Sequence, residues 1–110
     1  MKSISSHILD VSRGKPAEGV AVTLEFLRGD GFVQVAAGTT DSDGRIRDWQ
    51  FDFRTGTYRL RFAIDEYFAR LGEQAFYPYV EIVFLVGNTG QHYHVPLLLS
   101  AFGYSTYRGS

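Results

Sequence analysis

The sequence contains 110 residues with a formal net charge of −1, and this length suits one domain that occupies residues 1–110. It lacks the strong positive charge of nucleic-acid-binding proteins, and it contains no cysteine for disulfides or thiolate chemistry. No stretch approaches the roughly 20 apolar residues of a membrane span. Residues 1–16 contain no apolar run of the kind found in signal peptides. We therefore expect a cytoplasmic protein without nucleic-acid or membrane partners.

Short apolar and β-branched segments follow one another along most of the chain. They predict strands, in chain order, at residues 3–9, 20–28, 32–40, 57–65, 79–86, 91–100 and 104–108. Glycine, proline and charged residues predict a loop at 10–19, and "DSDGR" predicts a turn at 41–45. At 65–73 the apolar period changes from that of a strand to that of a helix, which predicts one short helix.

This pattern of seven to eight strands and one short helix predicts an all-β (mainly β) protein. At this length, such strands are expected to form a two-sheet β-sandwich. Pro96 lies inside the strand predicted at 91–100. Because proline has no N–H group to donate to a neighbouring strand, it predicts either a sheet edge or a β-bulge there.

The three histidines are the first candidates for chemistry. His7 lies in the first predicted strand, whereas His92 and His94 flank Tyr93 in a later one. Because side chains alternate along a strand, His92 and His94 share a face, and the apolar neighbours place that face away from the core. Three interpretations follow: solvated imidazoles, a zinc site formed with His7, or acid–base groups that titrate near neutral pH.

Two further segments carry polar groups in notable places. "TDSDGR" resembles the start of a calcium-binding loop but lacks the later ligands, so it predicts a turn. Arg45 ends this turn, where a guanidinium can bind an anion or stabilise an oxyanion. The chain ends in "YRGS", an aromatic residue, a cation, a glycine and a hydroxyl without a polar tail. From these residues alone, the ending is either a frayed strand or part of a site.

Several segments together resemble the transthyretin-related family, which includes the 5-hydroxyisourate hydrolases of urate catabolism. They are "SSHILDVSRGKPAEGVAVTLE", "TTDSDGR", "GQHYHVPLLLS" and "GYSTYRGS", and the resemblance runs from Ser3 to Ser110. The fold that it implies is the transthyretin (prealbumin-like) sandwich. Its most specific parts are His7, His94 and the terminal tetrapeptide. Ala101 departs from the family, which usually has proline there, in a turn where the effect should be on loop stiffness.

The resemblance implies an activity and a set of site residues. The activity is hydrolysis of 5-hydroxyisourate to 2-oxo-4-hydroxy-4-carboxy-5-ureidoimidazoline, with no metal or other cofactor, in a homotetramer built as a dimer of dimers. The implied catalytic residues are His7, Arg45, His94 and Ser110. The implied substrate-binding residues are Tyr107, Arg108 and Gly109. The resemblance assigns no role to His92, and it leaves open which of the two catalytic histidines is the base and which is the acid.

Two other functions stay open at the level of sequence. One is a non-enzymatic transthyretin-like protein that binds a small ligand. The other is a zinc hydrolase that uses His7, His92 and His94 as metal ligands.

Overall fold

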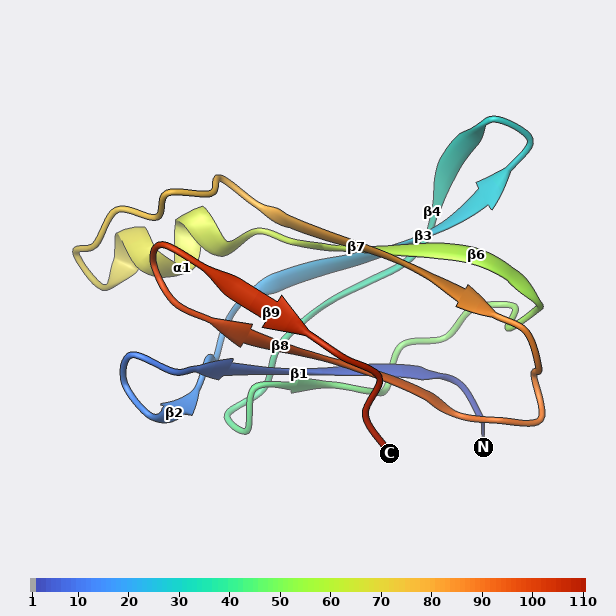
Figure 1. Cartoon of the computed structure of the whole chain (residues 1–110), viewed down its shortest axis with the longest axis horizontal. Helices are drawn as coiled ribbons and strands as arrows, with labels where there is room; N and C mark the ends of the chain where they lie inside the picture. The colour runs from blue at the N-terminus through green and yellow to red at the C-terminus, as the bar shows by residue number, and fades with distance from the viewer. Residues whose placement is uncertain (1) are drawn as a thin grey trace.

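The computed structural model describes residues 2–110 and arranges them in two facing β-sheets with one helix, as Figure 1 shows. One sheet has the order β2–β1–β8–β9, with β5 also paired to β1. Its strands are β1 Ile4–Asp10, β2 Lys15–Pro16, β5 Arg45–Ile46, β8 Tyr93–Leu99 and β9 Tyr104–Thr106. The other sheet has the order β4–β3–β6–β7, with β3 Ala21–Arg28, β4 Gly31–Thr39, β6 Gly56–Phe62 and β7 Val80–Val86. The predicted mainly β, two-sheet sandwich is confirmed.

The predicted elements agree with this structure apart from their ends. The two-residue strands β2 and β5 fall where a loop and a turn were predicted, and each pairs with β1. Helix α1 spans Ile64–Arg70, so the strand predicted at 57–65 ends earlier, at Phe62. Ile64 is buried at the start of the helix, so its apolar side chain fits a strand pattern and a helix pattern equally well. No helix in the described range is long and apolar enough to cross a membrane.

The core lies between the two sheets and follows the alternation of the strands. In β6, Tyr58, Leu60 and Phe62 are fully buried. In β8, the core is formed by Tyr93, Val95, Leu97 and Leu99. Because side chains alternate, the remaining residues of β8 face the outside of the sandwich. The sequence therefore places His94 on the outer face of a strand whose inner face is anchored by apolar packing.

Pro96 is accommodated in a way that the sequence did not predict. The expectation of a sheet edge was wrong, because β8 lies between β1 and β9. A bulge is also absent from this stretch, since Leu97–Thr106 and His94–Gly109 pair in one continuous register. Pro96 instead faces a gap in that pairing, and its carbonyl accepts a hydrogen bond from the Thr106 hydroxyl at 2.7 Å. The N–H that proline lacks would point to the same side, so no ladder bond is lost.

A buried carboxylate fixes the far end of β1 to the helix. Asp10 is fully buried and accepts hydrogen bonds from the Tyr67 hydroxyl at 2.7 Å and from the Arg13 backbone and guanidinium, both at 3.1 Å. Arg13 also contacts Glu73 at 2.6 Å, just beyond α1. Burial, reinforced by the bond to Asp10, raises the pKa of Tyr67 to about 12. The strand that carries His7 is thus held at its end by a satisfied polar network.

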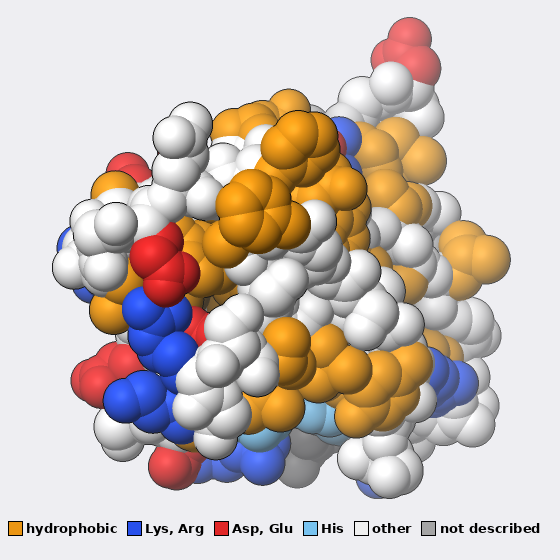
Figure 2. Space-filling model, turned by 60° about the vertical axis from the view of Figure 1, so that its left-hand side comes forward, with side chains coloured by type: hydrophobic (Ala, Val, Ile, Leu, Met, Phe, Trp, Pro, Cys, Tyr) orange, Lys and Arg blue, Asp and Glu red, His pale blue; other side chains and the backbone are white. Residues whose placement is uncertain are grey.

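Aromatic side chains reach the surface at the end of the molecule where α1 lies, and Figure 2 shows hydrophobic groups gathered on this side. The Tyr77 ring contacts the rings of Phe76 and Tyr104, with centroids 4.9 and 5.3 Å away. The Phe76 backbone N–H donates to the Ala101 carbonyl at 2.7 Å. This bond joins the segment after α1 to the turn between β8 and β9.

We expect Tyr67→Phe to lower the free energy of unfolding by about 1.5–3 kcal/mol, because it removes a hydrogen bond to a buried charged group. Urea unfolding measures this change. The matched control is Tyr79→Phe, at a side chain that is 41% exposed, where the change should stay within about 0.5 kcal/mol. Equal losses in the two variants would contradict the role of Tyr67.

Candidate functional site

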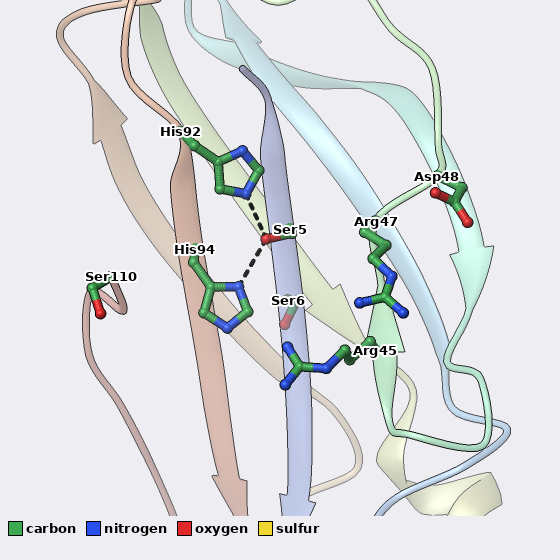
Figure 3. Close-up of a pocket in the computed structure, with 8 residues that line it drawn as sticks. All are labelled: Ser5, Ser6, Arg45, Arg47, Asp48, His92, His94 and Ser110. Atoms are coloured by element: carbon green, nitrogen blue, oxygen red, sulfur yellow. Dashed lines mark hydrogen bonds between the residues drawn. The ribbon is translucent and has the colours of Figure 1, made fainter. Parts of the chain in front are cut away.

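A cleft of about 370 Å³ opens on the outer face of the sheet that contains β1 and β8. Figure 3 shows the residues that line it, which come from the first strand, the segment around β5, the start of β8 and the chain terminus. They are Ser5, Ser6, Arg45, Arg47, Asp48, His92, His94 and Ser110. Three residues predicted to be catalytic are therefore brought to one cavity by segments far apart in the sequence: Arg45, His94 and Ser110.

The predicted turn at 41–45 is present, and it sets the position of Arg45. The Asp41 carboxylate accepts hydrogen bonds from the backbone N–H groups of Arg45 and Asp43, at 3.0 and 2.9 Å. These bonds, chiefly the one from Arg45, lower the pKa of Asp41. Gly44 has a φ of 73°, and a Cβ there would lie 2.5 Å from the Ile8 carbonyl oxygen. Glycine is thus required for the turn to lie against β1.

His7 lies beside this turn on the outer face of the sheet. Its backbone neighbours are Arg45 on β5 and Pro96 on β8, and its side chain is partly buried. His7 follows Ser5 by two residues in β1, so both point to the face that carries the cleft. It does not line the cavity itself, but it lies next to Arg45, which does.

His94 is partly buried, and its environment favours the neutral imidazole. Burial is the main cause that lowers its pKa, and electrostatic repulsion from Arg45 and from the neighbouring imidazoles lowers it further. The Nδ1 atom of His94 is 2.8 Å from the Ser5 hydroxyl oxygen. An imidazole with a lowered pKa carries a single ring proton at neutral pH, so the position of that proton matters for its chemistry.

The chain terminus returns to the sheet directly beside His94. The Gly109 N–H donates to the His94 carbonyl at 2.8 Å. A Cβ on Gly109 would lie 2.6 Å from Cδ2 of the His94 ring, so a larger residue would displace the imidazole. The family resemblance implied that Gly109 binds substrate, whereas its close neighbour in this chain is His94. Ser110 follows and lines the cleft.

Tyr107 and Arg108 lie apart from the cleft. The Arg108 guanidinium carbon is 4.3 Å from the centroid of the Tyr93 ring, and the group donates to the Gln91 side chain at 3.1 Å. Both residues line a different cavity of about 230 Å³, together with residues of β7. Tyr93 belongs to the inner face of β8, so these two side chains reach around the opposite side of the sheet. Their predicted contacts with substrate stay predictions.

Sequence reasoning missed the role of Ser5, which hydrogen-bonds to His94, and of His92, which hydrogen-bonds to Ser5. Ser5 had no predicted role, and His92 had one only as a ligand in the zinc alternative. His92 Nδ1 accepts from the Ser3 backbone N–H at 3.1 Å, and its Nε2 is 2.7 Å from the Ser5 hydroxyl oxygen. The signal was the His-x-His spacing, but its meaning depends on the pairing of Ser5 with His94, which only the fold reveals.

The zinc alternative finds little support in this geometry. Within residues 2–110, no group of three His, Cys, Asp or Glu side chains converges in the manner of metal ligands. His92 and His94 each direct one ring nitrogen at the Ser5 hydroxyl instead. His92 and His94 thus form a hydrogen-bonded series with Ser5.

Comparison with known proteins places this arrangement in a family. Residues 4–109 match the model of the HIUase/Transthyretin family. The chain belongs to this family. A 5-hydroxyisourate hydrolase of Salmonella typhimurium is 47% identical over 109 residues, which cover 97% of this chain and 80% of that protein.

Solved structures show two kinds of protein on this fold. The 5-hydroxyisourate hydrolase of Klebsiella pneumoniae superposes with a TM-score of 0.84 at 38% identity, covering 97% of this chain and 98% of that one. Sea bream transthyretin in complex with thyroxine superposes with a TM-score of 0.91 at 34% identity, covering 96% and 93%. In the HIUase/Transthyretin family the fold alone does not identify the function. The function must therefore be inferred from the residues of the cleft.

We expect Gly109→Ala to displace the His94 imidazole, because the added methyl group would overlap the ring. The imidazole resonances of His94 should shift in NMR spectra, and the free energy of unfolding should fall by about 1–3 kcal/mol. Gly103→Ala is the matched control, since a Cβ there meets no atom nearer than 3.9 Å. Unchanged His94 resonances in Gly109→Ala would contradict the close approach.

Acid should destabilise the protein partly through the two cleft histidines. The pKa of His92 and of His94 is lowered in the folded state, mainly by burial. As the pH falls below the unfolded pKa of about 6.5, the unfolded chain therefore binds more protons than the folded one. Stability that is present above this pH is lost as the pH falls toward the folded pKa values. Urea unfolding between about pH 7 and pH 5 should show a shallower loss in the double variant His92→Gln/His94→Gln, and equal slopes would contradict the prediction.

Proposed function

We propose that this protein is a 5-hydroxyisourate hydrolase of urate catabolism, formed by one transthyretin-like domain over residues 1–110. It hydrolyses 5-hydroxyisourate to 2-oxo-4-hydroxy-4-carboxy-5-ureidoimidazoline and uses no cofactor. The observation that carries the proposal is the meeting of Arg45, His94 and Ser110 in one cleft, with His7 beside Arg45. The similarity to 5-hydroxyisourate hydrolases of bacteria over at least 97% of this chain supports it.

The reaction needs three things that these side chains can supply. A water oxygen attacks the carbonyl carbon of a cyclic amide, and the carbon–nitrogen bond of the ring then breaks. A base takes a proton from the water, an acid supplies a proton to the leaving nitrogen, and a positive group stabilises the oxyanion. His7 and His94 divide the base and acid work, Arg45 stabilises the oxyanion, and the Ser110 hydroxyl orients water and substrate.

We also propose that the enzyme is a homotetramer, a dimer of dimers, that acts in the cytoplasm. Strands β7 and β9 are edge strands of their sheets, and they carry or adjoin apolar side chains that are largely exposed. Val83 is 58% exposed, Leu85 74% and Tyr107 58%. Burial of such edges between subunits removes apolar surface and unpaired strand edges from water. In that assembly Tyr107, Arg108 and Gly109 would contact the substrate in a channel between subunits.

We expect His7→Ala and His94→Ala each to reduce turnover of 5-hydroxyisourate by about 10²–10⁴-fold, the usual contribution of acid–base catalysis. The measurement is the decay of freshly generated substrate, followed by ultraviolet absorbance. Circular dichroism and thermal unfolding should show that both variants keep the fold. Arg28→Ala, at the exposed end of β3, is the control that should retain full activity. A fully active His94→Ala enzyme would contradict its catalytic role.

A parallel reaction with EDTA separates the alternatives. Acceleration that survives EDTA supports hydrolysis without metal, whereas acceleration abolished by EDTA would favour the three-histidine zinc hydrolase. No acceleration by folded, untagged protein would contradict the proposed activity. The remaining explanation would then be small-ligand binding, as in the thyroxine complex of sea bream transthyretin.

A further inference from the structure

A continuous series of hydrogen bonds ends on His94. It begins at the backbone N–H of Ser3, which is 3.1 Å from His92 Nδ1. His92 Nε2 is 2.7 Å from the Ser5 hydroxyl oxygen, and this oxygen is 2.8 Å from His94 Nδ1. Figure 3 shows both imidazoles directed at the Ser5 hydroxyl between them.

The first bond fixes the direction of the bond between His92 and Ser5. A backbone N–H can only donate, so His92 Nδ1 must be the unprotonated, accepting nitrogen. The proton of the neutral His92 ring is then on Nε2, which donates to the Ser5 oxygen. Ser5 has one hydroxyl proton, and its remaining partner is His94 Nδ1. Donation to His94 Nδ1 is the arrangement that gives the Ser5 hydroxyl proton an acceptor among the described residues, and the single proton of the neutral His94 ring is then on Nε2.

The reverse direction of the bond between His92 and Ser5 is chemically excluded. If the Ser5 hydroxyl donated to His92, both nitrogens of His92 would have to accept, and a neutral imidazole has only one accepting nitrogen. A charged His92 would point an N–H at the N–H of Ser3. Burial also lowers the pKa of His92, which agrees with a neutral ring.

We propose that Ser5 and His92 are positioning residues that hold His94 as the neutral imidazole with its proton on Nε2. Among the described residues, no hydrogen bond occupies this Nε2, and Figure 3 shows it on the side of the ring away from Ser5. His94 therefore offers the substrate a hydrogen-bond donor and no accepting nitrogen. The effect on catalysis rests on the proposed hydrolase function, whereas the proton position does not.

This arrangement divides the roles of the two catalytic histidines. A nitrogen that already carries a proton cannot take one from water, so His94 cannot be the base while the series is intact. The base is then His7. His94 Nε2–H donates a hydrogen bond to the carbonyl oxygen, as a neutral histidine does in other enzymes. The proton that His7 takes from the water is then the one that goes to the leaving nitrogen when the carbon–nitrogen bond breaks. The neighbouring Arg45 charge favours the same neutral state, because it lowers the pKa of His94.

The direct test is the proton position of His94 in the full-length wild-type protein. Histidine ring nitrogens labelled with ¹⁵N report in NMR spectra whether each nitrogen is protonated. We expect neutral His92 and His94 at neutral pH, each with a protonated Nε2 and an unprotonated Nδ1. In Ser5→Ala, His94 Nδ1 loses its donor, and the ring should shift to a mixture of the two neutral forms.

Enzyme kinetics tests whether the hydrogen bond from Ser5 to His94 contributes to catalysis. Ser5→Ala should lower kcat by about 10–100-fold and change KM less than about threefold. A loss of this size is usual when a group that orients a functional histidine is removed. Ser5→Thr keeps the hydroxyl and should restore most of kcat and the wild-type proton position. Ser100→Ala is the matched control, because it removes a partly buried hydroxyl at the other end of β8.

The outcomes are separable. A wild-type His94 that carries its proton on Nδ1, or is charged at neutral pH, overturns the proposal. So does a folded Ser5→Ala variant with unchanged kcat and unchanged His94 resonances. If Ser5→Ala does not fold, the wild-type spectrum and the Ser5→Thr variant still test the proton position of His94. If the wild-type protein does not hydrolyse 5-hydroxyisourate, the activity assignment fails while the NMR measurement still tests the proton position.

Discussion

The parallel pairing of β1 with β8 is the constraint on which the site depends. It joins a segment near the start of the chain to one near its end, and its register sets Ser5 beside His94 and His7 beside Pro96. Because side chains alternate on each strand, this single register brings all of these groups to one outer face. A slip by one residue would turn the histidines into the core. The apolar inner face, with Ile4 and Ile8 fully buried, makes that slip costly.

The terminal tetrapeptide follows from the neighbouring pairing of β8 with β9. Pro96 offers no donor, so the last strand can leave the ladder at Tyr107 and Arg108 without losing a bond to it. Pairing resumes at Gly109, whose missing side chain leaves room for the His94 ring. Ser110 then reaches the cleft. One proline and one glycine thus divide "YRGS" between the two sides of the sheet, with the Tyr107 and Arg108 side chains on one side and the Ser110 side chain on the other.

The local features of this chain could be predicted from its sequence, but the contacts between distant segments could not. The alternation of Tyr58, Leu60 and Phe62 predicts a half-buried strand because burial has a period of two. "DSDGR" predicts the turn before Arg45, because its aspartates and glycine favour local hydrogen bonds and a positive φ. The series from Ser3 through His92 to Ser5 depends on pairing across nearly the whole chain, and no local pattern records it. For the same reason Pro96 was predicted at a sheet edge or a bulge, because only the fold shows the gap in pairing opposite it.

The hydrogen-bonded series also explains why a His-x-His pair need not be a metal site. Zinc requires the lone pair of a ring nitrogen, whereas here His92 Nδ1 accepts from a backbone amide and the facing nitrogens of both rings contact a serine. The remaining nitrogen, Nε2 of His94, carries the proton that the series assigns to it. A metal would have to break several bonds and move a proton to gain two ligands. The same bonds that disfavour the metal prepare a neutral donor beside the fixed charge of Arg45, which is what a developing oxyanion requires.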